Sequence, residues 1–158
     1  MKPLKNWSNG FRLFGWIRRD GKKHNGLDGK DKIKGWYCAG TQVYTTFNEE
    51  VIFISDNVGG FGSRGYPGSV IITKFKYGEK WYTCLYGHVV SSLKEGDKLK
   101  PGDIIGVIDK YITWYNGKEE RADHIHFAVH EGQEIPPLPW GYVDNLNGWI
   151  YPNILKGE

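Results

Sequence analysis

Residues that favour β-strands gather in short runs, and a glycine or aspartate turn signal usually separates one run from the next. Valine, isoleucine, tyrosine and threonine are prominent in these runs, while 22 glycines and 15% aromatic residues argue against long helices. The predicted strands are Gln42–Thr46, Val51–Ser55, Ser69–Phe75, Lys80–Tyr86, Asp103–Ile108 and Ile125–His130. We therefore predict an all-β fold, mainly antiparallel sheet or sandwich, with long loops and little helix.

The length of the chain, 158 residues, is about that of one domain that can bury its own core. We expect a single domain over residues 1–158, with its core at about 11–130. The remainder, 131–158, reads as an extension that three prolines, Pro136, Pro137 and Pro139, keep extended rather than helical.

Composition excludes several classes of protein. Hydrophobic residues at 39% and charged residues at 25% are typical of a folded domain, not of a disordered chain. No run approaches the roughly 18 apolar residues of a membrane span. The net charge of +3 reads as ordinary solubility and does not argue for a nucleic-acid partner. The first residues, MKPLKNWSNG, lack the apolar stretch of a secretory signal, so we expect no signal peptide in this chain.

Local patterns predict three connecting segments. Lys76–Glu79 lies between two strand-like runs and reads as a hairpin turn. Asn57–Gly68 contains five glycines and is expected to be a mobile surface loop. Ser91–Lys94 is the one segment that suggests a brief helical turn.

The first candidate motif for chemistry is His24-Asn25-Gly26-Leu27-Asp28. Two glycines and an asparagine make a helix improbable here, but a turn at Gly26 can bring His24 and Asp28 together. The plain alternative is a pair of polar residues in a solvated loop, and that alternative is favoured when the motif stands alone.

A second motif, His124-Ile125-His126, lies in the last predicted strand. Side chains two residues apart in a strand point to the same face, so the two imidazoles stand side by side while Ile125, Phe127 and Val129 face a core. Two such imidazoles suit zinc, or one ligand beside one group that handles protons. The alternative is a pair of exposed histidines.

His88 ends the aromatic run that begins at Trp81, where alternation places it on the same face as Tyr82, Cys84 and Tyr86. A single histidine at a strand end is more often structural than catalytic. Cys84 is interpreted as a small buried residue, and a disulfide between it and the only other cysteine, Cys38, remains open.

Taken together, the histidines indicate a metal site. His24, Asp28 and one imidazole of the His124/His126 pair form a two-histidine, one-carboxylate set that leaves a fourth zinc position for water, as in catalytic sites. The remaining histidines can then activate the water and stabilise the oxyanion or protonate a leaving amine. Peptide hydrolysis at neutral pH becomes feasible with such a set.

The order of these motifs resembles the lysostaphin-type (LytM-like) zinc endopeptidases, which cut peptide cross-links in bacterial cell walls. Their signatures are HxxxD, a histidine in a Y-x-H context, and a late HxH followed by an aromatic residue. The segments that carry the resemblance are His24–Asp28, Tyr86–His88 and His124–Phe127, together with the flanking Phe14–Trp16, Gly21–Lys23, Gly40–Tyr44, Gly59–Gly62 and Val89–Ile108. The resemblance covers about residues 11–130.

The resemblance implies roles that spacing alone leaves open. It implies one Zn²⁺ per chain held by His24, Asp28 and His126, with His88 and His124 as the catalytic pair. It also implies a metallopeptidase domain with a duplicated-hybrid-motif-like antiparallel fold, peptidoglycan peptides as substrate, and action at the bacterial cell envelope or as a phage-encoded lysin.

The sequence departs from the family pattern at three places. Asp123 replaces the usual small residue or proline, Ala128 stands where glutamate is common, and Gly29–Ala39 is longer and more charged than usual. None removes a ligand, so these departures bear on the walls of the groove and on substrate choice.

Two other functions are weighed against the endopeptidase. One is a non-catalytic cell-wall or peptide-binding module that keeps the metal as structure. The other is a phosphocarrier or lipoyl-like β-domain, prompted by Glu95–Asp97 and Lys100–Asp103, although such carriers do not need HxxxD. Among the seven tryptophans, Trp114 is the one we expect to line a substrate groove, because it lies in the variable segment just before the HxH strand.

Overall fold

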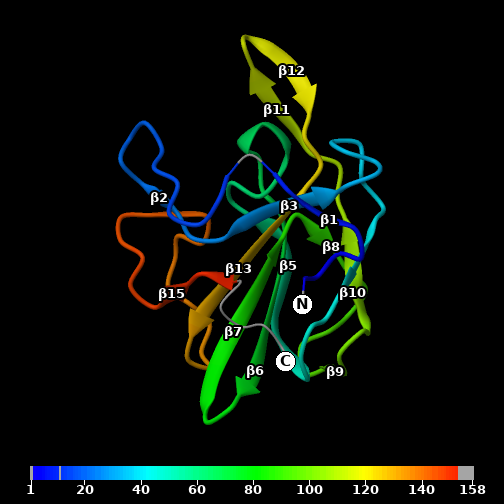
Figure 1. Cartoon of the computed structure of the whole chain (residues 1–158), viewed down its shortest axis with the longest axis vertical. Coiled ribbons are helices and arrows are strands. Elements are labelled where there is room, and N and C mark those ends of the chain that lie inside the picture. Colours follow the sequence, from blue (N-terminus) through cyan, green and yellow to red (C-terminus); the bar gives the residue numbers. More distant parts are fainter. Residues whose placement is uncertain (1, 11, 153–158) are drawn as a thin grey trace.

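Antiparallel strands make up nearly all the regular structure of the computed structural model, which describes residues 2–10 and 12–152 (Figure 1). The strands are β1 (Trp7–Asn9), β2 (Lys23–His24), β3 (Leu27–Asp31), β4 (Gln42–Tyr44), β5 (Glu49–Val58), β6 (Gly68–Tyr77), β7 (Lys80–Gly87), β8 (Val89–Val90), β9 (Lys98–Leu99), β10 (Ile104–Ile108), β11 (Ile112–Tyr115), β12 (Lys118–Arg121), β13 (Ile125–Glu131), β14 (Tyr142–Val143) and β15 (Trp149–Ile150). A three-residue 3-10 helix, η1, spans Ser63–Gly65. The described residues contain no helix of the length and apolar character that a bilayer crossing requires.

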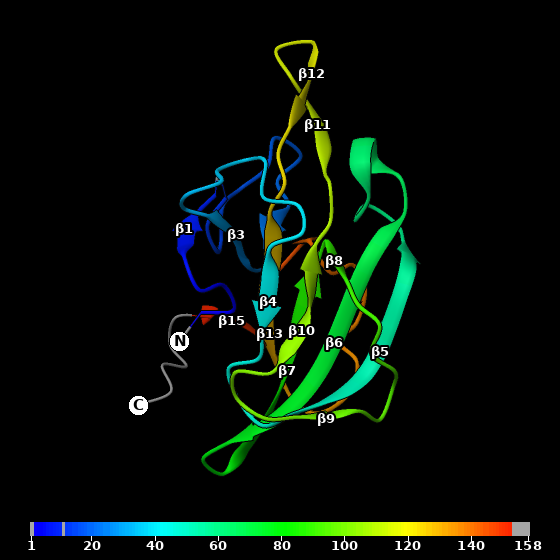
Figure 2. The same ribbon diagram turned by 90° about the vertical axis from the view of Figure 1, so that its right-hand side faces the viewer.

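The main sheet has eight strands in the order β1-β3-β13-β7-β6-β5-β9, with β15 pairing with β13. A smaller sheet, β4-β10-β8, packs against one face of it (Figure 2). Two separate hairpin-like pairs complete the fold: β11 with β12, which projects from one end of the molecule, and β14 with β2 (Figure 1). The sheets place β13, β7 and β6 at the centre of the structure.

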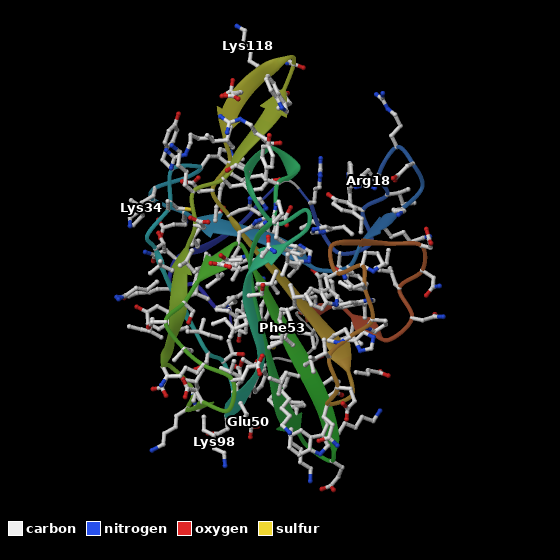
Figure 3. All side chains as sticks on the ribbon, turned by 180° about the vertical axis from the view of Figure 1, so that it is seen from behind. Arg18, Lys34, Glu50, Phe53, Lys98 and Lys118 are labelled. Atoms are coloured by element: carbon white, nitrogen blue, oxygen red, sulfur yellow. The ribbon has the colours of Figure 1, made fainter. Side chains whose placement is uncertain are left out.

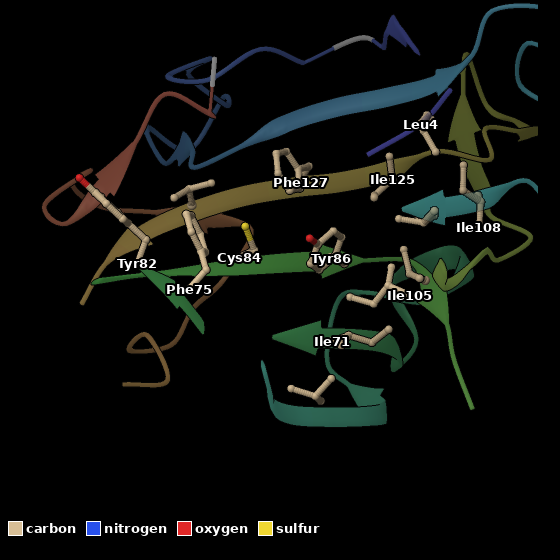
Figure 4. Packing of buried hydrophobic residues seen from close by; sticks show 14 of the residues in the cluster. Leu4, Ile71, Phe75, Tyr82, Cys84, Tyr86, Ile105, Ile108, Ile125 and Phe127 are labelled. Carbon is tan, nitrogen blue, oxygen red and sulfur yellow. The ribbon is translucent and has the colours of Figure 1, made fainter. Parts of the chain in front are cut away.

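The hydrophobic core lies on both faces of the central strands. Between the two sheets, side chains such as Ile71, Phe75, Tyr86, Ile105 and Phe127 form one buried cluster (Figure 4). On the other face, a second cluster includes Ile72, Leu85 and Ala128 from the strands and Trp140, Val143 and Trp149 from the C-terminal segment. The strands therefore carry apolar side chains on both faces, and residues 131–152 cover one of them.

One carboxylate is buried among the apolar side chains of the first cluster. Glu49 is 3% exposed, and its Oε1 accepts hydrogen bonds of 2.6 Å from the hydroxyls of Thr73 and Tyr86. Its Oε2 accepts from the backbone N–H groups of Thr46 and Phe47. Burial raises the pKa of Glu49, although these hydrogen bonds oppose the rise. The side chain thus ties the start of β5 to β6 and β7.

The all-β, antiparallel prediction is confirmed, and each of the predicted strands overlaps a strand of the structure. The hairpin turn between β6 and β7 is also present, with Gly78 at φ +63°.

The prediction of a helical turn at Ser91–Lys94 is wrong. There, Ser91 Oγ accepts from the N–H of Leu93 and Asp97 Oδ2 accepts from the N–H of Lys94, so side chains take up groups that a helix would use. Cys38 and Cys84 are both free and buried.

Candidate metal centre and groove

The register of the central sheet brings two candidate ligands together. In the antiparallel pair β13–β3, His126 is the direct cross-strand partner of Asp28. The third candidate ligand, His24, ends β2, and two residues separate it from the start of β3. The short connection passes close to β13, because a Cβ on Gly26 would lie 2.5 Å from the carbonyl oxygen of Phe127. Gly26 is therefore needed for this close approach and not for a positive φ, since its φ lies outside the left-handed range.

The three side chains converge on one point. His24 Nε2 lies 3.2 Å from Asp28 Oδ1, and His126 Nδ1 lies 3.5 Å from the same oxygen. The two ring nitrogens are 3.0 Å apart. All three residues are buried, and one ligand atom from each lies within 4.8 Å of the others.

In the rings of His24 and His126, the nitrogen that faces away from Asp28 is engaged in a hydrogen bond. This contact determines which nitrogen of each ring carries the proton. His24 Nδ1 donates to the carbonyl oxygen of Leu13 at 3.2 Å, and His126 Nε2 donates to the side-chain oxygen of Asn25 at 2.9 Å. His24 Nε2 and His126 Nδ1 therefore turn unprotonated faces towards each other and towards the Asp28 carboxylate. Two nitrogen lone pairs and a carboxylate repel one another at these distances unless a cation lies between them. The three donor atoms therefore fit zinc.

Burial controls the charge of the cluster. Burial opposes ionisation of Asp28, but His124, His126 and His24 together hold its pKa well below the ordinary value. Burial lowers the pKa of His126 to about 4, although its contact with Asp28 opposes the shift. The cluster at neutral pH is thus a carboxylate beside a neutral His126, the protonation states that metal ligation requires.

The remaining two histidines of the expected site lie beside this cluster. The rings of His88 and His124 are 4.5 Å apart, and His124 Nε2 lies 3.8 Å from Asp28 Oδ1. Both rings are held through Nδ1, which donates to the carbonyl of Phe61 in His88 (2.7 Å) and to that of Ala122 in His124 (2.6 Å). Neither Nε2 atom forms a hydrogen bond with any of the described residues, and that of His124 faces the Asp28 carboxylate. Burial, reinforced by His124, lowers the pKa of His88 well below its ordinary value.

The prediction of the sheet face on which the His88 side chain lies is wrong. Simple alternation put it with Tyr82, Cys84 and Tyr86, which lie in the first core cluster. Instead its ring contacts Phe61 of the second cluster and His124. The cause is local: His88 follows the end of β7 and has a left-handed φ of +63°, which interrupts the alternation.

Asp123, one of the departures from the family pattern, is fully buried next to His124. Its carboxylate accepts from the backbone N–H groups of Ala39 and Tyr111 at 3.0 and 2.8 Å and also pairs with Arg121. The ring of Tyr111 in turn lies 4.6 Å from His88 and 5.0 Å from His124. The carboxylate therefore joins three segments around the two histidines.

A cleft of about 1480 Å³ opens over the cluster. Its lining includes all five expected site residues, four histidines and one aspartate. The lining is also rich in aromatic residues: Trp16, Trp36, Phe53, Phe61, Tyr111, Trp114, Tyr115, Trp140 and Tyr142. Trp114 is 60% exposed and lies on β11, in the projecting hairpin. Figure 3 places Lys118, at the tip of this hairpin, and Arg18 at the same end of the molecule, away from Glu50 and Lys98.

The projecting hairpin is tied to the glycine-rich segment across the cleft. Arg64 of η1 forms a two-point ion pair with Glu119 of β12, with 3.0 Å between Nη2 and Oε2. Ser63 Oγ accepts from the N–H of Ile112 at 2.9 Å. The predicted glycine-rich loop, Asn57–Gly68, is thus the end of β5, η1 and the start of β6, and it forms one wall of the cleft.

The segment Arg12–Trp16 also contributes to the site, although the sequence analysis used only Phe14–Trp16, as a flank of the family resemblance, and assigned it no role. Its carbonyl groups accept from both ligand residues: Arg12 from the N–H of Asp28, Leu13 from His24 Nδ1, and Trp16 from the N–H of His24. Tyr142 was missed too; it pairs with His24 across β14–β2, and its ring lies 5.3 Å from the His24 ring. Backbone contacts of this kind leave no residue signature in the chain.

Comparison with known proteins agrees with this geometry. The family model described as "Peptidase family M23" matches residues 22–137, most of the chain. The protein is thus a peptidase by class. It belongs to peptidase family M23, and the resemblance to lysostaphin-type enzymes is confirmed.

Solved structures share the fold at low sequence identity. The catalytic domain of lysostaphin from Staphylococcus simulans is 21% identical with a TM-score of 0.62, over 96% of this chain and 92% of that one. LytU is 22% identical with a TM-score of 0.57, over 94% and 88%. The solution structure of lysostaphin is 23% identical with a TM-score of 0.58, over 84% of this chain. The match spans 46% of that longer protein. No curated protein matches the sequence.

Proposed function

We propose that this chain is a zinc-dependent endopeptidase that hydrolyses peptide cross-links or stem peptides of bacterial peptidoglycan. The observation that carries the proposal is the convergence of His24, Asp28 and His126 at the floor of an open cleft, with His88 and His124 beside them. Three protein ligands with an open side are typical of catalytic zinc, whereas structural zinc sites are closed by four.

In this proposal, three residues of the cluster are metal ligands and the two neighbouring histidines are catalytic. His24 Nε2, His126 Nδ1 and the Asp28 carboxylate would hold the ion. Zinc in this position supplies Lewis-acid activation of water and of the scissile carbonyl. His88, kept neutral by burial, accepts the proton of the attacking water through Nε2. The Phe61 carbonyl holds His88 in the Nδ1–H tautomer, which leaves Nε2 as the proton acceptor. The Ala122 carbonyl orients His124 through Nδ1, so Nε2 of this ring carries a proton only in the imidazolium form. In that form His124 Nε2 donates to the oxyanion or gives its proton to the leaving amine.

The substrate and its location follow from the cleft and the relatives. An aromatic-lined groove that is open to solvent suits an extended peptide, and we assign Trp114 on its projecting wall to substrate binding. Lysostaphin, whose structures share this fold, is described as an antimicrobial peptidase, which supports a cell-wall peptide as the substrate. Action at the bacterial cell envelope, or as a phage-encoded lysin, accords with that substrate.

The test combines metal analysis with digestion of purified cell walls of two cross-bridge types. Wild-type protein should bind one equivalent of zinc and release peptide fragments from at least one wall type. His24→Ala and His126→Ala should lose both zinc and activity. His88→Ala and His124→Ala should keep zinc and lose hydrolysis by at least about 100-fold.

His130→Ala is the matched control, because His130 lies on β13 but packs against Trp149 away from the cluster. It should keep both zinc and activity. Wild-type protein that binds zinc and wall peptides but releases no product from either wall would instead be the binding module with a structural metal. Failure to bind zinc would overturn the proposal outright.

A further inference from the structure

Arg12 lies outside the stretch matched by the family model and is fixed against the metal centre by its backbone. Its carbonyl oxygen accepts from the N–H of Asp28 at 3.1 Å. The N–H of Gly10 donates to the carbonyl of Asp28 at 2.8 Å. The backbone at Arg12 thus follows the strand that carries a candidate ligand, and the residue lines the cleft.

The guanidinium group is held in place by two aromatic rings. It lies 4.5 Å from the centre of the Trp16 ring and 5.6 Å from that of Tyr142. Its Nη1 donates to the hydroxyl of Tyr142. The Tyr142 ring also lies 5.3 Å from the ring of His24. Tyr142 therefore contacts both the guanidinium group and a candidate metal ligand. Stacking of this kind orients the planar group before any ligand arrives.

Within the described residues, no carboxylate lies within 4.0 Å of this guanidinium. Arg18 of the same wall already pairs with Asp20, and the Asp28 carboxylate faces the three histidines. Lys22 adds a further positive charge to the lining of the cleft. One wall of the cleft beside the metal centre therefore carries an oriented, half-buried cation that has no carboxylate partner among the residues that the structure describes.

We propose that Arg12 makes the enzyme select peptides that carry a carboxylate next to the scissile bond, through a charge-assisted hydrogen bond in the cleft. This inference rests on the proposed function and narrows its substrate. The planar guanidinium group of an arginine can form two parallel hydrogen bonds with a carboxylate. A substrate whose peptide cross-bridge contains only neutral residues would leave the Arg12 cation without a partner. Stem peptides with free carboxylates fit the wall better than stems in which those groups are amidated.

The test uses two cross-linked muropeptides that are identical except that the stem carboxylates are free in one and amidated in the other. For the zinc-loaded wild type, kcat/KM should favour the free form by about 10- to 100-fold, the value of one charged hydrogen bond. Arg12→Gln should bring this ratio close to one, and Arg12→Lys should restore part of it. Tyr142→Phe, which removes the partner hydroxyl, should lower the ratio less than Arg12→Gln does.

Arg19→Gln is the matched control, because Arg19 is exposed and does not line the cleft; its ratio should equal that of the wild type. Dissociation constants of the same two muropeptides are measured in parallel on zinc-loaded His88→Ala protein. Hydrolysis of both forms at equal rates, or an unchanged ratio in Arg12→Gln, would overturn the role of Arg12 and leave the endopeptidase intact. Tight binding of the free form without hydrolysis by the wild type would support Arg12 and overturn the endopeptidase. Absence of both binding and hydrolysis would overturn both.

Discussion

The side-chain oxygen of Asn25 accepts a 2.9 Å hydrogen bond from Nε2 of His126, 101 residues away in the chain. Asn25 is fully buried, and its backbone N–H donates to the carbonyl of Gly141. The asparagine next to one candidate ligand therefore sets the tautomer of another. Contacts of this kind orient ligand histidines and raise their basicity.

Asn25→Ala should weaken zinc binding by about 10- to 100-fold, because His126 Nδ1 is then no longer held as the unprotonated nitrogen. Competition with a chromophoric chelator measures the affinity, and Asn48→Ala at an exposed asparagine is the control. Equal zinc affinities for the two variants would contradict a tautomer-setting role for Asn25.

Gly26→Ala should destabilise the fold by about 1–3 kcal/mol, since the new methyl overlaps the backbone of β13 and must push it away. The added Cβ would lie 2.5 Å from the Phe127 carbonyl oxygen and 2.9 Å from Ala128 Cβ. Denaturant unfolding of the metal-free protein measures the loss. Gly59→Ala is the matched substitution, because nothing lies within 4 Å of its Cβ and its φ is not left-handed. Similar stability of the two variants would show that β13 accommodates the methyl.

Asp123→Ala should cost about 1–3 kcal/mol of unfolding free energy, because two backbone N–H groups lose their acceptor. Asp123→Asn, which keeps one acceptor oxygen, should cost less. Asp109→Ala, at an exposed carboxylate nearby, controls for charge. If Asp123→Ala unfolds at the same denaturant concentration as Asp109→Ala, the carboxylate does not join the segments around His88 and His124.

Glu49 should give the stability a specific pH dependence. Because burial raises its pKa in the folded state, the folded protein holds this proton more tightly than the unfolded chain does. The associated stability is present below the ordinary pKa of 4.5 and is lost as pH rises through the raised value. The unfolding free energy of wild type minus that of Glu49→Gln should therefore fall as pH increases above about 4.5.

Glutamine can replace the neutral acid here, since its oxygen can accept from the two N–H groups while its amide donates to the hydroxyls of Thr73 and Tyr86. Urea unfolding between pH 4 and pH 8 measures the difference. Glu50→Gln, at a partly exposed neighbour, is the comparison. A difference that is flat or that rises with pH would refute the assignment.

The strands could be predicted from sequence because β-branched and aromatic residues gather between turn signals, as in Ser69–Phe75. The HxH pair could be predicted because its period of two is local. His88 was assigned to the wrong face, since a left-handed residue interrupts alternation and histidine carries no signal of that conformation. Arg12 and Tyr142 reach the site only through tertiary contacts with His24 and Asp28, which composition and spacing do not encode.

Because Asp28 pairs directly with His126 across β3 and β13, a zinc ion bound by these two residues would also report on correct folding. If either strand slipped by a single position, the His126 ring would turn to the opposite face of the sheet and leave the carboxylate behind. Misaligned molecules would then be unable to load zinc. The metal stoichiometry of a renatured preparation should accordingly count the fraction of chains in which the central strands are correctly aligned.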